Sequence, residues 1–339
     1  MLMSPQGFYD GKSVLVTGGC GSFGQAVIEE LLRRPVGVVR VYDHDENGLW
    51  TLREKYRGEK RVRLLLGDVR DLPRLGMACT DVDVVIHAAA LKHVENCEYN
   101  PFEAVKTNVL GTQNVIDAAL AENVGKVVLT STDKAANPGN VMGTTKLLAE
   151  KLVVAANYYR GKHRTAFSCV RFGNVLGTRG SAPLLFREQI AAGGPVTITD
   201  RKMTRFVMTL QDAVRLVLET VSMTRGGETF ILKMQSVRIT DLAAVMIREL
   251  GGNRTPTKVT GTKPGEKLYE ELMVEDEVRR AWDLPDMYLL LPNMPELVPD
   301  TMKSYAGAKP ARRVAYRSDR ARKLTQPEIA KLLRAEGLL

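Results

Sequence analysis

Thr132, Asp133 and Lys134 follow one another directly after the apolar run 126–131. Such a run is typical of a buried strand, and ligands bind at the carboxyl ends of strands in open α/β sheets. A carboxylate and an amine at that place can take and return protons during a reaction. The alternative is that Asp133 and Lys134 form an ion pair that serves only the structure.

A glycine-rich turn follows another apolar run, 13–17. Gly18, Gly21 and Gly24 have the spacing GxxGxxG and precede a stretch of helical periodicity. Glycines allow a tight turn and a close approach to a pyrophosphate, which also binds the free N–H groups of the helix N-terminus. The residues expected to bind a dinucleotide here are Gly18, Gly21, Ser22, Phe23 and Gly24.

Other residues would complete this cofactor site. Asp43 ends the next apolar run, where a carboxylate can bind the adenosine ribose hydroxyls and repel a 2′-phosphate, so NAD is favoured over NADP. Asp68 is placed to meet the adenine edge, unless it caps a helix. His87 is expected to be a packed histidine. The further predicted contacts are His44, Val69, Ala88, Ala89 and Ala90.

The pattern along the chain predicts an α/β fold with a doubly wound parallel Rossmann sheet and a smaller C-terminal domain. Predicted strands are 13–17, 38–43, 62–67, 82–87, 126–131, 165–171 and 229–233, and predicted helices are 22–33, 49–57, 101–120, 144–159, 211–221 and 240–250. The segment 284–310 is expected to be irregular. We assign 8–175 to the NAD-binding domain, with 206–234 returning to it, and 176–205 with 235–300 to a substrate-binding domain.

Composition excludes several classes of protein. The 339 residues are 44% hydrophobic but hold no run of the ~18–20 apolar residues that span a membrane, nor a signal peptide, so a cytoplasmic enzyme is expected. The four cysteines form no CxxC pair, which argues against a zinc site or a disulfide framework, and no metal is predicted.

The net charge of +9 does not indicate nucleic-acid binding, because basic and aromatic residues are not interleaved. Residues 301–339 hold ten Lys or Arg and three acidic residues, 10 − 3 = +7, and most of the excess charge therefore lies there. We interpret 301–339 as a basic C-terminal tail, expected to be solvated.

Several motifs make a connected set: AAALKHV at 88–94, NVLGT at 108–112, STDKAANP at 131–138, RFGNVLG at 171–177 and KPGEK at 263–267. Over residues 10–275 the chain resembles the UDP-N-acetylglucosamine 4,6-dehydratases of bacterial polysaccharide biosynthesis, which are extended short-chain dehydrogenases. The resemblance implies a lyase that recycles NAD, acts on UDP- or another NDP-linked N-acetylhexosamine, and forms homo-oligomers. Many such proteins have an N-terminal membrane region, which we do not expect in this chain.

The chain departs from the usual YxxxK pair of short-chain dehydrogenases. Its lysine is Lys146, but Met142 stands in the place of the tyrosine. A thioether cannot accept a proton from an alcohol, so either another residue does this work or the protein is inactive. A subgroup of these dehydratases is active with methionine at this place, and the resemblance therefore favours an active enzyme.

The resemblance implies oxidation of the sugar at C4, loss of water across C5 and C6, and return of the hydride to C6. Thr132 would bind O4, Asp133 would take the O4 proton, and Lys134 would take the C5 proton. Lys134 must then be neutral, so we expect its pKa to be lowered by burial or by a cation such as Lys146. Lys146, and with it Asn108, is expected to contact the cofactor.

Arginines are suited to a substrate diphosphate because their planar fork matches phosphate oxygens. The predicted substrate-binding residues are Lys92, Asn174, Arg179, Ser181, Arg205 and Glu266. Two other functions stay open. A nucleotide-sugar 4-epimerase would share the first hydride transfer but need no base at C5, and a non-catalytic NAD-binding regulator would explain Met142.

Overall fold

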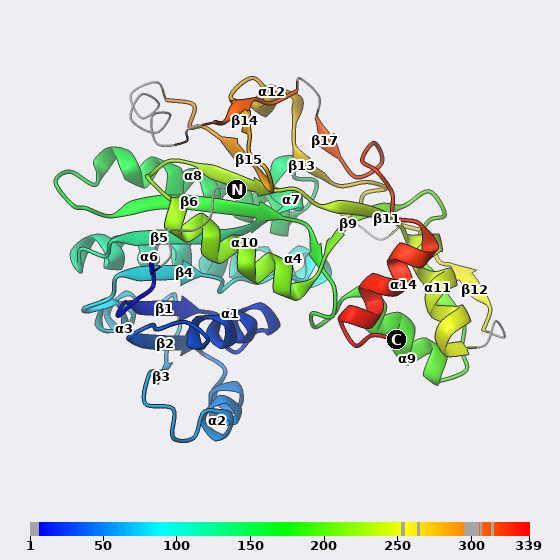
Figure 1. Cartoon of the computed structure of the whole chain (residues 1–339), viewed down its shortest axis with the longest axis horizontal. Helices are drawn as coiled ribbons and strands as arrows, with labels where there is room; N and C mark the ends of the chain where they lie inside the picture. The colour runs from blue at the N-terminus through cyan, green and yellow to red at the C-terminus, as the bar shows by residue number, and fades with distance from the viewer. Residues whose placement is uncertain (1–6, 252–254, 263–264, 295–304, 306, 313–314) are drawn as a thin grey trace.

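The computed structural model describes residues 7–251, 255–262, 265–294, 305, 307–312 and 315–339. Its main feature is a ten-stranded sheet with the order β16-β14-β15-β10-β6-β5-β4-β1-β2-β3 (Figure 1). The strands are β1 (Ser13–Thr17), β2 (Val38–Asp43), β3 (Val62–Leu66), β4 (Val84–His87), β5 (Lys126–Thr132), β6 (Ala166–Phe172), β10 (Thr229–Leu232), β14 (Ala281–Asp283), β15 (Met287–Leu290) and β16 (Lys309–Pro310). All neighbours from β3 to β10 are parallel, which confirms the doubly wound sheet.

Helices cover both faces of the sheet, and this explains the continuous apolar runs of its strands. On β1, Val14 and Val16 lie in one core with α1 (Ser22–Leu32) and α10 (Leu210–Met223). Leu15 lies in the other core. Successive side chains of a strand point to opposite faces, so both sets of positions must be apolar. The helices on the second face are α3 (Leu72–Cys79), α6 (Gly111–Ala121) and α8 (Val141–Tyr159). A further helix, α2 (Glu46–Lys55), follows β2 in the chain.

The helix predicted over 101–120 is divided in the structure. A short α5 (Pro101–Ala104) leads into a π-helical segment, Val105–Leu110, before α6 begins. Asn108 lies in the π-helical segment, and its side-chain amide binds the backbone of Leu91 at both N–H and C=O. A π turn of this kind is not visible in apolar periodicity, since it adds one residue to a helix without changing its apolar composition.

A smaller lobe, seen on the right of Figure 1, follows β6 in the chain. It has its own buried core, to which Phe186, Val207, Met246 and Leu333 contribute. Its elements are β7 (Asn174–Val175), α9 (Ala182–Ala191), β8 (Val196–Ile198), β9 (Thr204–Met208), β11 (Gln235–Arg238), α11 (Ile239–Gly251), β12 (Thr257–Val259) and α14 (Gln326–Ala335).

Two predictions about the C-terminal third were wrong. Residues 284–310 are not irregular throughout, because β15 pairs with β10 and extends the central sheet. For the same reason β14 and β15 do not belong to the smaller lobe, although we assigned 235–300 to it. Residues 295–304 and 306 lie outside the described residues.

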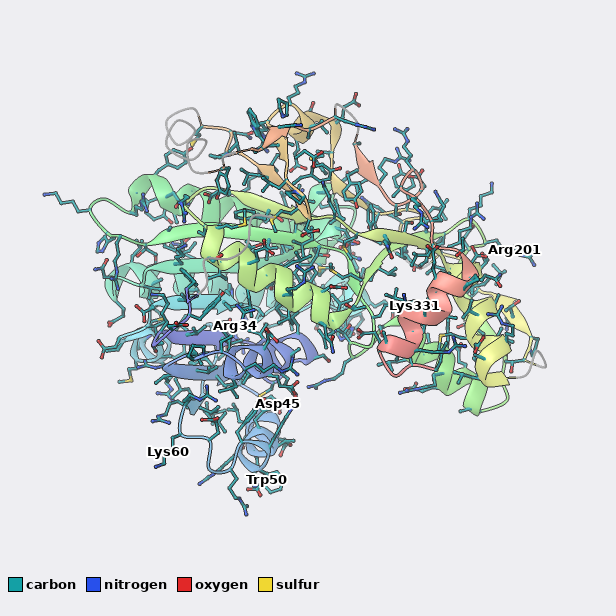
Figure 2. The ribbon with its side chains drawn as sticks, in the orientation of Figure 1. Arg34, Asp45, Trp50, Lys60, Arg201 and Lys331 are labelled. Atoms are coloured by element: carbon teal, nitrogen blue, oxygen red, sulfur yellow. The ribbon has the colours of Figure 1, made fainter. Side chains whose placement is uncertain are left out.

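The segment 301–339 is not a solvated tail where the structure describes it. β17 (Tyr316–Arg317) pairs with β13 (Glu271–Met273), and α14 packs against α11. Helix α14 buries Ile329 and Leu333 and turns its charges outward, among them Lys331 (Figure 2). A count of charged residues does not reveal that the apolar residues of this helix lie on one face. No helix among the described residues is both long and apolar enough to cross a membrane.

A buried ion network joins the sheet to its C-terminal extension. Arg171 on β6 is 1% exposed and donates to Glu150 at 2.6 Å and to Glu277 at 2.9 Å. Glu150 lies on α8 and Glu277 on α12 (Glu275–Val278). The guanidinium therefore joins β6 and α8, which are consecutive in the chain, to α12, which lies about a hundred residues further on.

We expect Arg171→Ala to destabilise the protein by about 3–5 kcal/mol, because it leaves two carboxylates buried without their cation. Urea denaturation of variant and wild type measures this difference. The control is Arg33→Ala, which removes an ion pair from a side chain that is 67% exposed and should cost less than about 1 kcal/mol. An equal loss of unfolding free energy in the two variants would contradict the stabilising role of the buried network.

Candidate active site

A cavity of about 1450 Å³ lies at the carboxyl ends of the parallel strands, between the sheet and the smaller lobe. It brings together residues from every part of the predicted site, from the glycine turn after β1 to Glu266. This is the place where open α/β sheets bind ligands. Of the described residues, no three His, Cys, Asp or Glu side chains are grouped as a metal ion would require.

The glycine turn leaves no room for side chains. Gly18 has φ +70°, and a Cβ there would lie 2.7 Å from the backbone N of Ala89. A Cβ on Gly24 would lie 2.4 Å from the carbonyl O of Gly18. Asp43 at the end of β2 accepts a hydrogen bond from the N–H of Cys20 at 2.8 Å, so it holds the turn as well as facing the cavity. All five predicted residues of the turn line the cavity: Gly18, Gly21, Ser22, Phe23 and Gly24.

The other residues predicted to bind the cofactor line the cavity, with one exception. His44, Asp68, Val69 and Ala88 to Ala90 line the cavity. Asp68 is ion-paired with Arg70 at 2.6 Å, and hydrogen bonds from Arg70 lower the pKa of its carboxyl. The helix cap is Asp71, not Asp68. Asn108 does not line the cavity: its amide is taken up by Leu91 and Thr145, so it supports the wall instead of touching a ligand.

His87 is packed, as expected. It is 1% exposed and lies between the hydroxyls of Thr17, at 2.7 Å, and Thr112, at 3.1 Å. Burial, with a smaller effect of Lys146, lowers the pKa of His87 to about 3. The ring is therefore neutral at neutral pH.

The predicted reacting end is built on the last residue of β5 and the short α7 (Asp133–Ala136). Thr132 and Lys134 line the cavity, whereas the side chain of Asp133 has no exposed surface. Its Oδ1 accepts hydrogen bonds from the Thr132 hydroxyl and from Lys134 Nζ, both at 2.9 Å. Its Oδ2 is buried without a hydrogen-bond partner. Asp133 can thus reach a substrate only through its two neighbours.

The prediction that the pKa of Lys134 is lowered was wrong. Burial lowers it, but Asp133 and Glu270 together outweigh burial, and the pKa of Lys134 is raised. Glu270 is 3% exposed, and its carboxylate lies 3.5 Å from Lys134 Nζ. Sequence reasoning missed Glu270, because it stands far from residue 134 and no local motif marks it as an acid–base residue.

Lys146 and Met142 lie one turn apart on α8 and both line the cavity. Lys146 Nζ donates to the carbonyl O of Thr130 at 2.7 Å. Burial lowers the pKa of Lys146 to about 8, against the opposing effect of Glu150. Met142 is 4% exposed and packs with Cys97 and Ala104, so this position provides no proton acceptor.

The predicted substrate residues all line the cavity: Lys92, Asn174, Arg179, Ser181, Arg205 and Glu266. Lys92 Nζ donates to the carbonyl O of Arg179 at 2.7 Å. Arg205 lies 3.4 Å from a carboxylate oxygen of Glu266. The hydroxyl of Ser181, at the start of α9, is buried without a hydrogen-bond partner.

Further lining residues were not predicted. The hydroxyl of Ser131 is buried without a partner in this wall. An apolar part of the wall comes from the smaller lobe, with Leu185, Phe186, Ile198, Ile239 and Leu242. Their positions depend on how the lobe folds over the sheet, which no local pattern encodes.

Comparison with known sequences gives strong matches. A family model described as "Polysaccharide biosynthesis protein" matches residues 14–292. A UDP-N-acetylglucosamine 4,6-dehydratase (inverting) of Campylobacter jejuni is 42% identical, over 84% of each chain. A UDP-glucose 4-epimerase of Rickettsia canadensis is 40% identical over 82% of each chain. An uncharacterized membrane protein of Methanocaldococcus jannaschii is 53% identical over 86% of this chain and 89% of its own.

Solved structures agree with this picture. The X-ray structure of Pen from Bacillus thuringiensis has a TM-score of 0.91 and 43% identity, and the match covers 98% of this chain and 99% of that chain. MoeE5 in complex with UDP-glucose and NAD has a TM-score of 0.63 and 27% identity, over 75% of this chain and 87% of its own.

The burial of His87 predicts a specific pH dependence of stability. The folded-state pKa is lowered from 6.5 to about 3, so the unfolded chain binds a proton first as the pH falls. The contribution of His87 is full above pH 6.5 and is lost as the pH falls toward 3. From pH 7 to pH 4.5 the free energy of unfolding of wild type should therefore fall by about 2–3 kcal/mol more than that of His87→Gln. Urea denaturation at the two pH values measures this, and parallel losses in both proteins would contradict it.

Proposed function

The chain belongs to the polysaccharide biosynthesis protein family that contains the UDP-N-acetylglucosamine 4,6-dehydratases, and from this we propose that it is an NAD-dependent nucleotide-sugar 4,6-dehydratase. Its substrate would be UDP-N-acetylglucosamine or a close NDP-linked N-acetylhexosamine, converted to the 4-keto-6-deoxy sugar. The observation that carries the proposal is the placement of Thr132, Lys134 and Lys146 in one cavity, with Asp133 behind them.

The cavity fits NAD at the end of β1. Because side chains are excluded at Gly18 and Gly24, a pyrophosphate could approach the backbone there. Asp43 at the end of β2 lines the cavity and would bind the adenosine ribose. Lys146 would bind the nicotinamide ribose. When bound, NAD would accept a hydride from sugar C4 and later return it to C6.

The nucleotide diphosphate would bind on the side of the smaller lobe. Arg205 and Arg179 offer planar donors for phosphate oxygens, and the unpaired Ser181 hydroxyl at the start of α9 is a further donor. Glu266 would bind a ribose hydroxyl, Asn174 would contribute to the diphosphate site, and Lys92 would line the sugar pocket.

Thr132 and Asp133 would together remove the O4 proton. O4 would donate to the Thr132 hydroxyl, which in turn donates to Asp133 Oδ1 at 2.9 Å. Proton transfer along this pair leaves the proton on the buried carboxyl, and no tyrosine is required. The buried Asp133 thus acts as the base for O4 through Thr132.

Lys134 would then remove the C5 proton, which the new C4 ketone makes acidic. The hydroxyl at C6 leaves as water and takes, by way of the Thr132 hydroxyl, the proton that Asp133 holds. Lys134 returns its proton to C5 after the hydride has reached C6. The amine must be neutral before it can act, and the carboxylates that hold its proton oppose this step.

A 4-epimerase is the second candidate, supported by the 40% identity to a protein described as a UDP-glucose 4-epimerase. An epimerase needs no base at C5 and no acid at C6, so Lys134 in the cavity wall favours dehydration. A non-catalytic regulator is less well supported, since the Thr132–Asp133 pair supplies the acceptor that Met142 lacks.

Incubation of the purified protein with UDP-N-acetylglucosamine in deuterium oxide tests the proposal. We expect loss of water and one solvent deuteron at C5, measured by mass spectrometry and proton NMR. A galacto isomer of unchanged mass would establish epimerisation. No turnover with UDP or GDP sugars would support the regulator.

Replacement of Lys134 separates dehydration from binding. Lys134→Met should lower the rate of water loss and of deuterium entry at C5 by about 10²–10⁴-fold, because the C5 base is gone. Binding of UDP, measured by calorimetry, should be unchanged. Lys151→Met, an exposed change on α8, serves as the control and should turn over like wild type. Full activity of Lys134→Met would assign the C5 base elsewhere.

A further inference from the structure

One oxygen of Glu270 lies between two cations of different parts of the site. Its Oε1 is 3.5 Å from Nζ of Lys134 and 3.8 Å from Nε of Arg205. Lys134 stands at the proposed reacting end, and Arg205 at the proposed diphosphate end. Glu270 is therefore a direct electrostatic link between the two ends.

The position of Glu270 is fixed by backbone contacts with the C-terminal segment. Its N–H donates to the Ser318 hydroxyl at 3.0 Å, and its carbonyl O accepts from the N–H of Ser318 at 2.9 Å. The same hydroxyl lies 2.8 Å from that of Thr204, the neighbour of Arg205 on β9. The carboxylate is thus presented by a rigid backbone to both cations.

The surroundings of Glu270 favour protonation more than those of an ordinary carboxyl. Burial and the nearby charge of Asp133 raise its pKa, whereas Lys134, Arg205 and Lys267 oppose the rise, and the net direction is upward. In the free protein the proton still resides on Lys134, because Asp133 and Glu270 both face the amine and raise its pKa.

We propose that Glu270 is a positioning residue that activates Lys134 when a diphosphate binds Arg205. The inference rests on the proposed function, because it takes Arg205 as a phosphate ligand. A phosphate that engages the guanidinium neutralises the cation that stabilises ionised Glu270. The carboxylate then accepts a proton from Lys134: one N–H bond breaks, one O–H bond forms, and the amine keeps its electron pair.

This transfer makes the lysine reactive only when substrate is present. Lys134 and Glu270 together hold one proton before and after the transfer. Activation of the amine therefore does not require loss of a proton to solvent. Without such a transfer, the negative charge of a bound diphosphate would act in the opposite direction and hold the proton on Lys134 more firmly. The two cases therefore predict opposite signs for the effect of a diphosphate on the amine.

Competitive acetylation of lysines with acetic anhydride, read by peptide mass spectrometry, measures how much of Lys134 is neutral. The probe is UDP, which carries the diphosphate but leaves the sugar pocket open. We expect UDP to raise the acetylation rate of Lys134 at pH 7, by roughly tenfold for each unit by which its pKa falls. A rate that stays constant or falls, while calorimetry shows UDP bound, would overturn the inference.

Substitutions of Glu270 test whether its carboxylate accepts the proton of Lys134. Glu270→Gln should abolish the response of Lys134 to UDP, and Glu270→Asp should restore part of it. The matched control, Glu275→Gln, changes an exposed residue of α12 and should respond like wild type. A full UDP response in Glu270→Gln would show that another group takes the proton.

Turnover gives a second reading that a merely structural role would not produce. In Glu270→Gln, Lys134 must lose its proton to solvent, so kcat should fall about 10²-fold at pH 7 and rise with pH, while KM stays within about twofold. A uniform loss of kcat at every pH would instead indicate a structural role and contradict the proposal. If the wild-type protein binds GDP and not UDP, GDP serves as the probe in the same experiments. A wild-type protein that binds neither would contradict the proposed function itself and, with it, this inference.

Discussion

The buried charge of Lys134 is the constraint on which the active site depends. An ammonium group in a wall of low polarity must be paired, and here two carboxylates, Asp133 and Glu270, hold it. Each acidic residue is in turn held by other groups: the carboxylate of Asp133 by the Thr132 hydroxyl, that of Glu270 by Arg205, and the backbone of Glu270 by Ser318. The end of β5, the strand β9 and the C-terminal segment therefore meet around a single amine.

Two lysines of the same cavity have opposite electrostatic environments. Burial dominates at Lys146 and lowers its pKa to about 8, whereas the carboxylates dominate at Lys134 and raise its pKa. This difference suits different tasks. Lys146 binds a backbone carbonyl and would hold a ribose, whereas Lys134 would release its proton only when a diphosphate is bound. In the proposed mechanism Thr132 and Asp133 would move the O4 proton, and Met142 would then not be a sign of lost function.

The sequence was most informative where the chemistry is local. The glycine turn, Asp43 and the run from Thr132 to Lys134 are contiguous or end predicted strands, so the topology of a parallel sheet brings them together. The sequence was least informative for contacts across long separations. Glu270 and Ser318 join the site only after the C-terminal segment has folded back, and the amphipathic α14 was hidden by its charges. The predicted direction of the Lys134 pKa was wrong because two carboxylates together outweigh burial: Asp133 is a neighbour in sequence, but Glu270 comes from a distant part of the chain.

A crystal structure with UDP-N-acetylglucosamine bound tests the central claim most directly, because it shows the sugar nucleotide together with the charged side chains that would contact it. The account predicts that Lys134 Nζ faces C5 at about 3–3.5 Å, that O4 contacts the Thr132 hydroxyl, and that Arg205 contacts the diphosphate. A sugar with C5 turned away from Lys134, or an Arg205 that remains with Glu270 and Glu266 while the diphosphate lies elsewhere, would contradict it.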